Sequence, residues 1–340
     1  MTVDFSTRCR DLLAELGLIE ADAMISVTPL SGGVASDIAK VTVGQDGTPD
    51  QKRYCVKFAL AKLRVKADWF APVTRSFAEY QWLKTAAQIS PDTAIRLYGH
   101  SERLNGFVMS YLEGEETCLF KSELLAGSGH AEQAEAVGRL LGQIHAASTA
   151  PGFDSSAFDN RDDFHAIRIE PYLIHTARLY PSHKALFHQV ADQLYQSQQV
   201  LIHGDVSPKN ILFQKNRPYL LDAECATMGD ASFDVCFCLN HFILKAVHVP
   251  GCLARYLLFC SRFWAAYRGF VSWEEGAALE QRIVKLLPMM MLARIDGKSP
   301  VEYLSEYEQA HIRQVALHLL EGPAHSLDDF IQRIERHTPQ

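Results

Sequence analysis

The sequence predicts an α+β fold in two lobes, because its first third alternates like β-strands and the remainder has helical periodicity. The chain has 340 residues, of which 48% are hydrophobic and 21% are charged, as in a folded protein with a sizeable core. One core rarely extends beyond roughly 250 to 300 residues, which favours two lobes. Charged residues and glycine interrupt the strand pattern at residues 112–116. We therefore place the lobes at residues 1–112 and 113–340.

The first lobe is predicted to begin with an amphipathic helix and to continue as an antiparallel sheet. Leu12, Leu13 and Leu16 would share one helical face, and Gly17 suits the end of that helix. Glycine-containing turns then separate three short strands, which predicts a three-stranded meander. The expected elements are strands at residues 24–30, 37–43 and 53–59, a helix at 74–88, and strands at 94–99 and 106–111.

The second lobe is predicted to be mostly helical. An apolar stripe indicates a helix over residues 131–147, and two further helices should precede residue 199. Two short strands, at residues 200–203 and 219–221, should flank a polar loop. Five helices are expected from residue 233 onward.

Charge and hydropathy exclude several classes of protein. The 33 basic and 40 acidic residues give a formal net charge of −7, whereas proteins that bind nucleic-acid phosphates normally carry a basic excess. The most apolar stretch, residues 233–249, contains Asp234, Asn240 and Lys245, which favours a buried helix over a membrane span. Charged residues near the N-terminus occupy the place of a secretory signal's apolar run. We expect a cytoplasmic protein with no nucleic-acid or membrane partner.

The eight cysteines show no spacing typical of a zinc site or a disulfide scaffold. We expect reduced thiols, with Cys236 and Cys238 acting as small apolar residues in a buried helix.

The most informative segment is HGDVSPKN at residues 203–210, followed by LDAE at residues 221–224. Phosphoryl transfer requires a carboxylate that orients the attacking hydroxyl and accepts its proton, together with oxygen ligands for Mg²⁺. Asp205 would be that base, and Asn210 and Asp222 would hold the metal. The alternative is a capped turn followed by a buried aspartate in a hairpin.

With these motifs the chain resembles the aminoglycoside phosphotransferase and choline kinase superfamily, which has the protein-kinase-like fold. The resemblance covers roughly residues 25–295 and implies an α+β chain with a sheet-containing N-lobe and a helical C-lobe. It implies Glu224 as a further metal ligand and Asp234 as a structural residue that holds the catalytic loop. The matching residues are His203, Gly204, Asp205 and Asn210, then Asp222 and Glu224, then Gly229, Asp230, Phe233 and Asp234.

The resemblance also implies a nucleotide site in the N-lobe. The segment that contains Gly32, Gly33 and Ser36 is similar to the family's phosphate-covering loop, in which glycine lets backbone amides approach phosphate closely. Lys57 lies in an apolar strand, where an unpaired ammonium would be costly to bury, and it would bind ATP phosphates together with Glu79.

Residues 107–112 resemble the family's hinge. This resemblance places Met109 behind the adenine and assigns the base edge to the backbone of Ser110 and Leu112. An ordinary strand that connects the lobes is the alternative, and both can hold.

Residues 57–79 are similar to a stretch of methylthioribose kinases. Trp69 would then lie on a loop that closes over the site and excludes water, or it would be a surface residue packed on the lobe. Arg294 and Asp296, in the turn after residues 289–292, are further candidates for substrate contact.

Together these features predict a phosphotransferase that depends on ATP and Mg²⁺ and moves the γ-phosphoryl group to a hydroxyl of a small molecule, either sugar-like or an amino-alcohol. Residues 224–229 leave too little chain for the long activation segment of a protein kinase. The alternatives are an aminoglycoside-modifying resistance kinase and a non-catalytic nucleotide-binding regulator on the same fold. The sequence makes no prediction of the oligomeric state.

Overall fold

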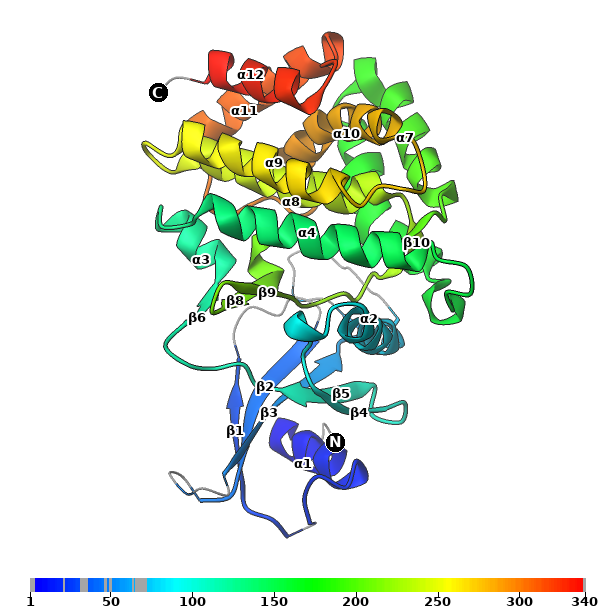
Figure 1. The fold of residues 1–340 in the computed structure, drawn as a ribbon, viewed down its shortest axis with the longest axis vertical. Coiled ribbons are helices and arrows are strands. Elements are labelled where there is room, and N and C mark those ends of the chain that lie inside the picture. Colours follow the sequence, from blue (N-terminus) through cyan, green and yellow to red (C-terminus); the bar gives the residue numbers. More distant parts are fainter. Residues whose placement is uncertain are drawn as a thin grey trace. The chain divides into compact units, whose positions relative to one another are not determined.

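A computed structural model of the chain describes residues 4–20, 22–30, 36–45, 48, 51–62, 64 and 72–338. It divides into two compact units, Met1–Glu115 and Glu116–Gln340. The first unit contains a sheet of five strands with helices, and the second is mainly helical (Figure 1). The predicted α+β fold class, with antiparallel strands first and helices afterwards, is confirmed.

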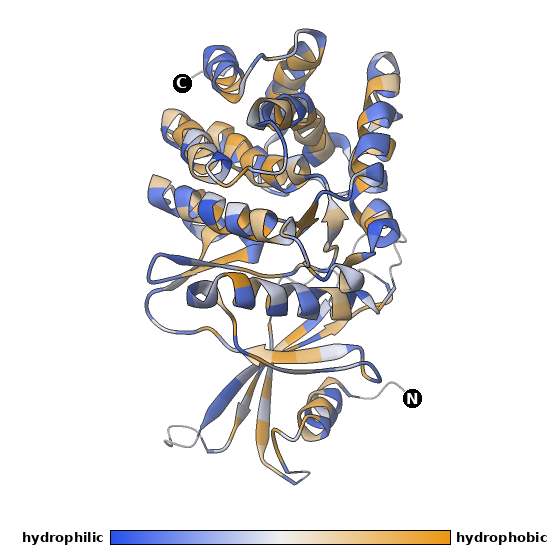
Figure 2. Cartoon of the chain, turned by 45° about the vertical axis from the view of Figure 1, so that its right-hand side comes forward, coloured by the Kyte–Doolittle hydropathy of each residue, from blue (hydrophilic) through white to orange (hydrophobic). Residues whose placement is uncertain are grey.

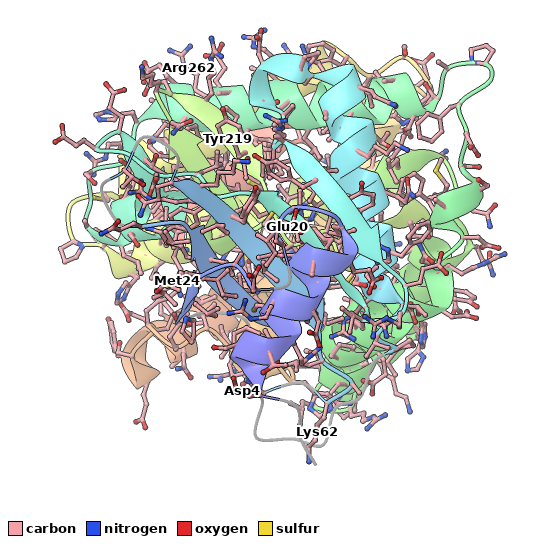
Figure 3. All side chains as sticks on the ribbon, turned by 90° about the horizontal axis from the view of Figure 1, so that it is seen from below. Asp4, Glu20, Met24, Lys62, Tyr219 and Arg262 are labelled. Atoms are coloured by element: carbon pink, nitrogen blue, oxygen red, sulfur yellow. The ribbon has the colours of Figure 1, made fainter. Side chains whose placement is uncertain are left out.

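The sheet of the first unit is antiparallel, with the strand order β1-β2-β3-β5-β4. The predicted meander of the first three strands is confirmed, and Gly17 ends the first helix with a φ of 67°. Asp4, just before the first helix, and Met24, just before the first strand, are both exposed (Figure 3). The elements are α1 (Phe5–Glu15), β1 (Ile25–Pro29), β2 (Ser36–Val43), β3 (Lys52–Ala59), α2 (Arg75–Ile89), η1 (Pro91–Thr93), β4 (Leu97–Ser101) and β5 (Gly106–Ser110).

Strand alternation gives the two faces of this sheet different contents. Val56 and Phe58 of β3 belong to a core cluster that includes Leu12 and Leu13 of α1. Successive side chains of a strand point to opposite faces, so Lys57 lies on the other face. There it pairs across the ladder with Phe107 of β5, whose ring contacts Tyr80 of α2. A cation is thereby placed on the α2 side of an otherwise apolar strand.

The fourth strand differs from its predicted position. It was expected at residues 94–99, but β4 spans Leu97–Ser101. The reason is the turn of η1, which is closed by a hydrogen bond from the amide of Ala94 to the carbonyl of Pro91 and delays entry into the sheet.

The second unit contains most of the helices and two small sheets. Strand β7 pairs with β10, and β8 lies between β6 and β9. Its helices are α3 (Phe120–Leu125), α4 (Ala131–Ser148), α5 (Arg161–Phe164), α6 (His175–Ala177), α7 (Lys184–Gln196), α8 (Ala231–His248), α9 (Leu253–Arg268), α10 (Gly276–Asp296), α11 (Glu306–Glu321) and α12 (Leu327–His337). Its strands are β6 (Thr117–Leu119), β7 (Val200–Ile202), β8 (Ile211–Gln214), β9 (Arg217–Leu220) and β10 (Thr227–Gly229). The π-helical segment η3 (His165–Ile174) and the short turns η2 (Ser156–Phe158), η4 (Pro181–His183) and η5 (Pro208–Asn210) connect them.

Helix α8 forms the centre of this unit. Every residue from Ala231 to Ala246 is buried, and α9 and α10 pack against the helix. The other helices carry hydrophobic and hydrophilic stripes, which lets them cover the core with one side (Figure 2). Five helices follow residue 230 in the described part of the chain, as predicted. Among the described residues no helix is both long and apolar enough to cross a membrane.

The two strands predicted on either side of the polar loop are present as β7 and β9. They belong to different sheets, because β7 pairs with β10 and β9 pairs with β8. Lys215 and Asn216, both with positive φ, close the β8–β9 hairpin in the way that two-residue hairpin turns require. All eight cysteines are free thiols, and both Cys236 and Cys238 are buried, as predicted.

Candidate active site

The HGD segment begins where β7 ends. Gly204 has a φ of +78°, and a Cβ on it would lie 2.9 Å from the Cβ of Cys225. Only glycine avoids both the strained backbone and this clash. The amide of Asp205 donates to Nδ1 of the buried His203, whose pKa is lowered by burial, so the ring stays neutral. A tight turn therefore presents Asp205 directly after the strand.

Asp234 at the start of α8 fixes this turn. Its carboxylate accepts hydrogen bonds from the backbone amides of His203 at 2.6 Å and Gly204 at 2.8 Å. The imidazole of His145 on α4 lies 3.3 Å from the same carboxylate and 2.7 Å from the Tyr267 hydroxyl. All of these groups are buried. The predicted structural role of Asp234, which is to hold the loop that carries Asp205, agrees with these contacts.

Asp205 is buried between two cations. Its Oδ2 atom accepts a hydrogen bond from Nη2 of Arg168 at 2.8 Å and lies 3.3 Å from Nζ of Lys209. Burial alone would raise the pKa of this carboxyl, but the charges of Lys209 and Arg168 outweigh it and lower the pKa well below 3.8. Among the described residues Oδ1 makes no hydrogen bond of ordinary length and angle, and the nearby Ser207 hydroxyl further lowers the pKa. Asp205 is therefore an ionised carboxylate with one oxygen available.

Arg168 is a site residue that the sequence analysis missed. It lies in η3, where Nε also donates to the carbonyl of Gly204 at 2.6 Å. A signal was present, because an arginine between Ile167 and Ile169 interrupts an apolar run just as Lys57 does. Lys209 lies within the HGDVSPKN motif. Its side chain is 42% exposed, yet its ammonium pairs with Asp205.

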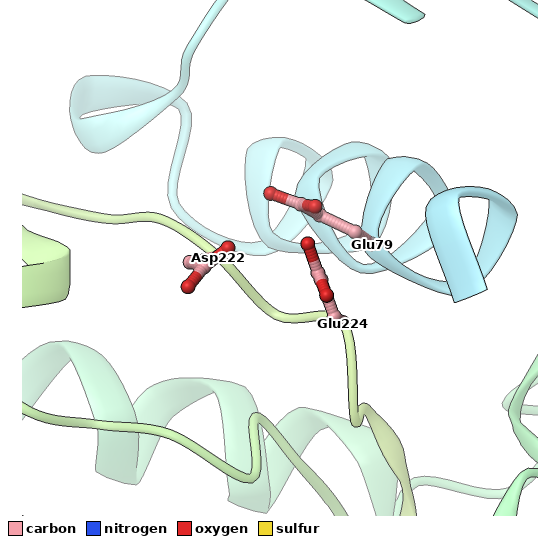
Figure 4. A group of neighbouring side chains, drawn as sticks. All are labelled: Glu79, Asp222 and Glu224. Carbon is pink, nitrogen blue, oxygen red and sulfur yellow. The ribbon is translucent and has the colours of Figure 1, made fainter. Parts of the chain in front are cut away.

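Asn210, Asp222 and Glu224 follow on the hairpin and the segment after it. Nδ2 of the Asn210 side chain donates to the backbone carbonyl of Asp205 at 3.1 Å. The backbone amide of Leu221 donates to the backbone carbonyl of Asn210 at 2.9 Å. Asp222 adopts a positive φ of 69°, which is uncommon for a residue with a Cβ. Asp222 and Glu224 follow β9 (Figure 4), and each offers a carboxylate oxygen within 4.8 Å of the other. These oxygen donors are of the type that a hard divalent cation prefers.

The first unit contains a buried ion pair. Nζ of Lys57 on β3 lies 2.6 Å from Oε2 of Glu79 on α2, and both residues are almost fully buried (Figure 4 includes Glu79). Arg75, one turn before Glu79, donates to the carbonyls of Pro72 and Leu60 and so ties the start of α2 to the end of β3. The predicted partnership of Lys57 and Glu79 is thus present in the fold.

The remaining nucleotide candidates lie on β2 and at the end of β5. Met109 is buried on β5, where it pairs with Cys55, and the amide of Ser110 donates to the carbonyl of Arg96. Leu112 follows β5, and Ser36 is the buried first residue of β2. Gly32, Gly33 and Trp69 lie outside the described residues.

The two C-terminal candidates lie within α10 and not in the predicted turn, because the helix continues to Asp296, and both make contacts within the second unit. Arg294, buried on α10, donates to the Tyr172 hydroxyl at 3.1 Å and to Ser299. Asp296 pairs with Arg313 at 2.7 Å and accepts from the Tyr180 hydroxyl. Asp296 is therefore bound to a cation already, whereas Arg294 has no carboxylate within ion-pair distance among the described residues.

This fold, together with the loop around Asp205, is that of a small-molecule phosphotransferase. The model of the phosphotransferase enzyme family matches residues 26–270, and the chain belongs to this family. The predicted superfamily is confirmed. The local similarity to methylthioribose kinases stays a prediction.

Solved structures share this fold at low sequence identity. A choline/ethanolamine kinase family protein from Mesorhizobium loti is 13% identical, covers 97% of this chain and 98% of its own, and has a TM-score of 0.52. Amicoumacin kinase, solved with AMP-PNP, Ca²⁺ and Ami, is 14% identical over 90% of this chain and 91% of its own, with a TM-score of 0.56. An ethanolamine kinase from Plasmodium vivax is 12% identical over 97% and 87%, with a TM-score of 0.52. A search of curated proteins gives no significant match.

Proposed function

We propose that this protein is a phosphotransferase that uses ATP and Mg²⁺ to phosphorylate a hydroxyl of a small molecule. The observation that carries this proposal is Asp205, an ionised carboxylate on a loop anchored by Asp234, with one oxygen that makes no hydrogen bond of ordinary length and angle among the described residues. Membership of the phosphotransferase enzyme family supports the same reaction type.

Asp205 would orient the acceptor hydroxyl and take its proton. In the proposed step the hydroxyl oxygen forms a bond to the γ-phosphorus, the bond from that phosphorus to the β–γ bridging oxygen breaks, and ADP leaves. The low pKa of Asp205 makes it a weak base, so it contributes mainly by hydrogen bonding and positioning. Arg168 and Lys209 keep the carboxylate ionised and in place.

A divalent cation would be held by Asp222, Glu224 and Asn210, whose oxygen donors suit Mg²⁺. When bound, such an ion would neutralise charge on the phosphate oxygens. The amicoumacin kinase of similar fold was solved with AMP-PNP and Ca²⁺, which supports nucleotide and divalent metal use here.

The nucleotide would be bound by the first unit. In this proposal Lys57, positioned by Glu79, contacts phosphate oxygens, and the backbone of Ser110 and Leu112 binds the base next to Met109. The 2.6 Å contact between Lys57 and Glu79 supports that arrangement. The segment with Gly32, Gly33 and Ser36 would cover the phosphates.

The acceptor is proposed to be a small hydroxyl compound bound by the second unit. Trp69, Arg294 and Asp296 remain candidates for contacts with it. Choline/ethanolamine kinase family proteins share the fold, which supports a small acceptor over a protein.

Asp205→Asn tests the proposal, because it keeps the shape of the side chain and removes the charge. We expect kcat for acceptor-dependent ADP formation to fall by about 10²–10⁴ while ATP binding persists. Asp192→Asn on the exposed side of α7 is the matched control and should leave kcat unchanged. Turnover near that of the wild type in Asp205→Asn would refute the role of Asp205. ATP binding without ADP formation for any acceptor would instead support a non-catalytic regulator.

A further inference from the structure

The second unit buries a group of basic side chains beyond Asp205. Lys245 and His241 lie on α8, and Arg294 lies on α10, with 1%, 6% and 8% of their surface exposed. We call these three residues the basic cluster. It has no role in the contacts that anchor the catalytic loop.

The basic cluster has neutral partners. Nζ of Lys245 lies 3.4 Å from the Tyr303 hydroxyl and 4.8 Å from the centre of that ring, so an ammonium with three donors has one hydroxyl partner. Arg294 donates to the Tyr172 hydroxyl and to Ser299. Among residues 72–338, no carboxylate lies within 4 Å of either cation.

A carboxylate that could have neutralised the cluster is already paired. Glu302 influences Lys245 and Arg294 electrostatically, but it accepts its hydrogen bond from Lys121. Burial lowers the pKa of His241 well below its ordinary value, so the positive charge of the cluster belongs to Arg294 and, when it is protonated, to Lys245.

Buried polar atoms of the same region lack partners. In the described part of the chain, Nε of Arg294, Nδ1 of His241 and Oδ1 of Asn240 make no hydrogen bond. Burying such groups without partners is costly. Nε of Arg294 can donate to a ligand, Nδ1 of His241 can donate or accept, and Oδ1 of Asn240 can accept.

The basic cluster is continuous with Asp205 through Phe237. The ring of Phe237 lies 5.7 Å from that of His241, 5.5 Å from that of Tyr172 and 5.9 Å from the guanidinium of Arg168. Arg168 binds Asp205, and Tyr172 binds Arg294. A chain of contacting side chains, Arg168, Phe237 and Tyr172, therefore links the proposed base to Arg294.

We propose that the acceptor carries an oxyanion, which Arg294 and Lys245 bind while its hydroxyl lies at Asp205, so that the substrate class is the small hydroxycarboxylates. This inference rests on the proposed function. Burying a cation without a counter-ion is costly, and an anionic ligand would offset that cost, whereas a cationic amino-alcohol or aminoglycoside would increase it.

The electrostatics of Lys245 agree with this assignment. Burial, together with the nearby charges of Lys121 and Arg294, lowers the pKa of Lys245 to about 7. An anion beside it would raise that pKa again.

The test uses the full chain and sets of acceptors with one carbon skeleton and different charge. Glycerate, glycerol and 3-aminopropane-1,2-diol form the first set, and erythronate, erythritol and 1-aminobutane-2,3,4-triol form the second. Glycerol 3-phosphate distinguishes a phosphate from a carboxylate. Calorimetry measures binding without nucleotide, and acceptor-dependent ADP formation measures turnover.

We expect at least one carboxylate to bind at least tenfold more tightly than its neutral and cationic counterparts. Arg294→Met and Lys245→Met should each reduce this preference about tenfold or more, and Arg294→Lys should restore part of it. Arg262→Met, which removes an exposed cation on α9 (Figure 3), should leave the preference unchanged. Urea unfolding of each variant reports whether it is folded.

Several outcomes would overturn the inference: tighter binding of the amino-alcohols, equal binding within each set, or no binding of any carboxylate. A stronger response to glycerol 3-phosphate than to the carboxylates would replace the carboxylate with a phosphate and overturn the named class. The proposed function is judged separately. Turnover of an amino-alcohol alone would preserve it and reject the anion, whereas carboxylate binding with no ADP formation from any acceptor would do the reverse.

Discussion

Two buried aspartates, Asp205 on the loop after β7 and Asp234 on α8, are held in opposite ways. Asp234 receives hydrogen bonds from two backbone amides and contacts the ring of His145. Asp205 is bound by two cations through Oδ2, and its Oδ1 makes no hydrogen bond of ordinary length and angle in the described residues. The carboxylate of Asp234 is occupied by backbone donors, so its role is to hold the chain in place. The carboxylate of Asp205 is paired through Oδ2, which leaves Oδ1 for chemistry.

The comparison predicts the largest loss of stability at Asp234. Asp234→Ala leaves the amides of His203 and Gly204 buried without this acceptor, and we expect a cost of about 3–5 kcal/mol. Urea unfolding of the purified chain measures it. Asp205→Asn keeps its neighbours in place and should cost clearly less. Equal losses for these two variants would break the distinction between them.

Removing a cation from Asp205 should change the pH dependence of the reaction. The folded pKa of Asp205 lies below its ordinary value of 3.8, so its stabilising contribution is present above that value and is lost as pH falls through the folded pKa. Arg168→Met should raise the pKa, which moves the acid limb of kcat/KM upward by about 1–3 pH units. Lys209→Met should move it less, because Lys209 is half exposed. If the acid limb of kcat/KM stays at the same pH in Arg168→Met, Arg168 does not control the ionisation of Asp205.

Lys245 of the basic cluster is the opposite case, a buried cation with no carboxylate partner among the described residues. Lys245 has a pKa of about 7 in the folded chain, below the ordinary 10.5, so the unfolded chain binds more protons between these values. Its contribution therefore makes stability rise with pH in that window, by at most about 1.4 kcal/mol per pH unit. Lys121 and Arg294 lower this pKa, while Glu302 and Cys238 raise it.

Lys245→Met should flatten that dependence. The variant should be more stable than the wild type below pH 7, and its advantage should shrink as pH rises toward 10. Thermal or urea unfolding at pH 6 and pH 9 gives the difference. An advantage that is the same at both values would show that Lys245 titrates as an ordinary lysine.

The smallest change in the free energy of unfolding is expected at an exposed ion pair. Arg139 pairs with Glu135 one turn away on α4, with side chains 53% and 36% exposed. Arg139→Gln should cost only about 0.3–0.5 kcal/mol, because solvent screens such a pair. A cost above 1 kcal/mol in urea unfolding would mean that charge at the surface matters more here than the buried pairs suggest.

Much of the fold follows from local pattern. Period-two alternation located β1, β2 and β3 to within a residue or two, and Gly17 marked the end of α1. The apolar run after residue 230 gave α8 because helices that are apolar on all sides must be buried. These signals lie within a few neighbouring residues and need no knowledge of distant contacts.

The pairings depend on contacts that local pattern does not contain. The tight turn at Lys215 and Asn216 joins β9 to β8, whereas β7 pairs with β10, which lies further along the chain. Arg168 reaches Asp205 across 37 positions from a π-helical segment that contains Pro171. The motif could identify Asp205 and it contains Lys209, but it could not reveal Arg168, the second cation that sets the ionisation of Asp205.

The glycine at position 204 has a consequence for covalent reagents. Its turn lies directly against Cys225, a buried thiol whose pKa is raised to about 12, so little nucleophilic thiolate exists at neutral pH. Because Cys225 is buried and its Cβ and carbonyl pack against this turn, a reagent could reach its sulfur only when that packing opens. Slow inactivation by an alkylating agent would therefore act as a clock for transient opening of the loop.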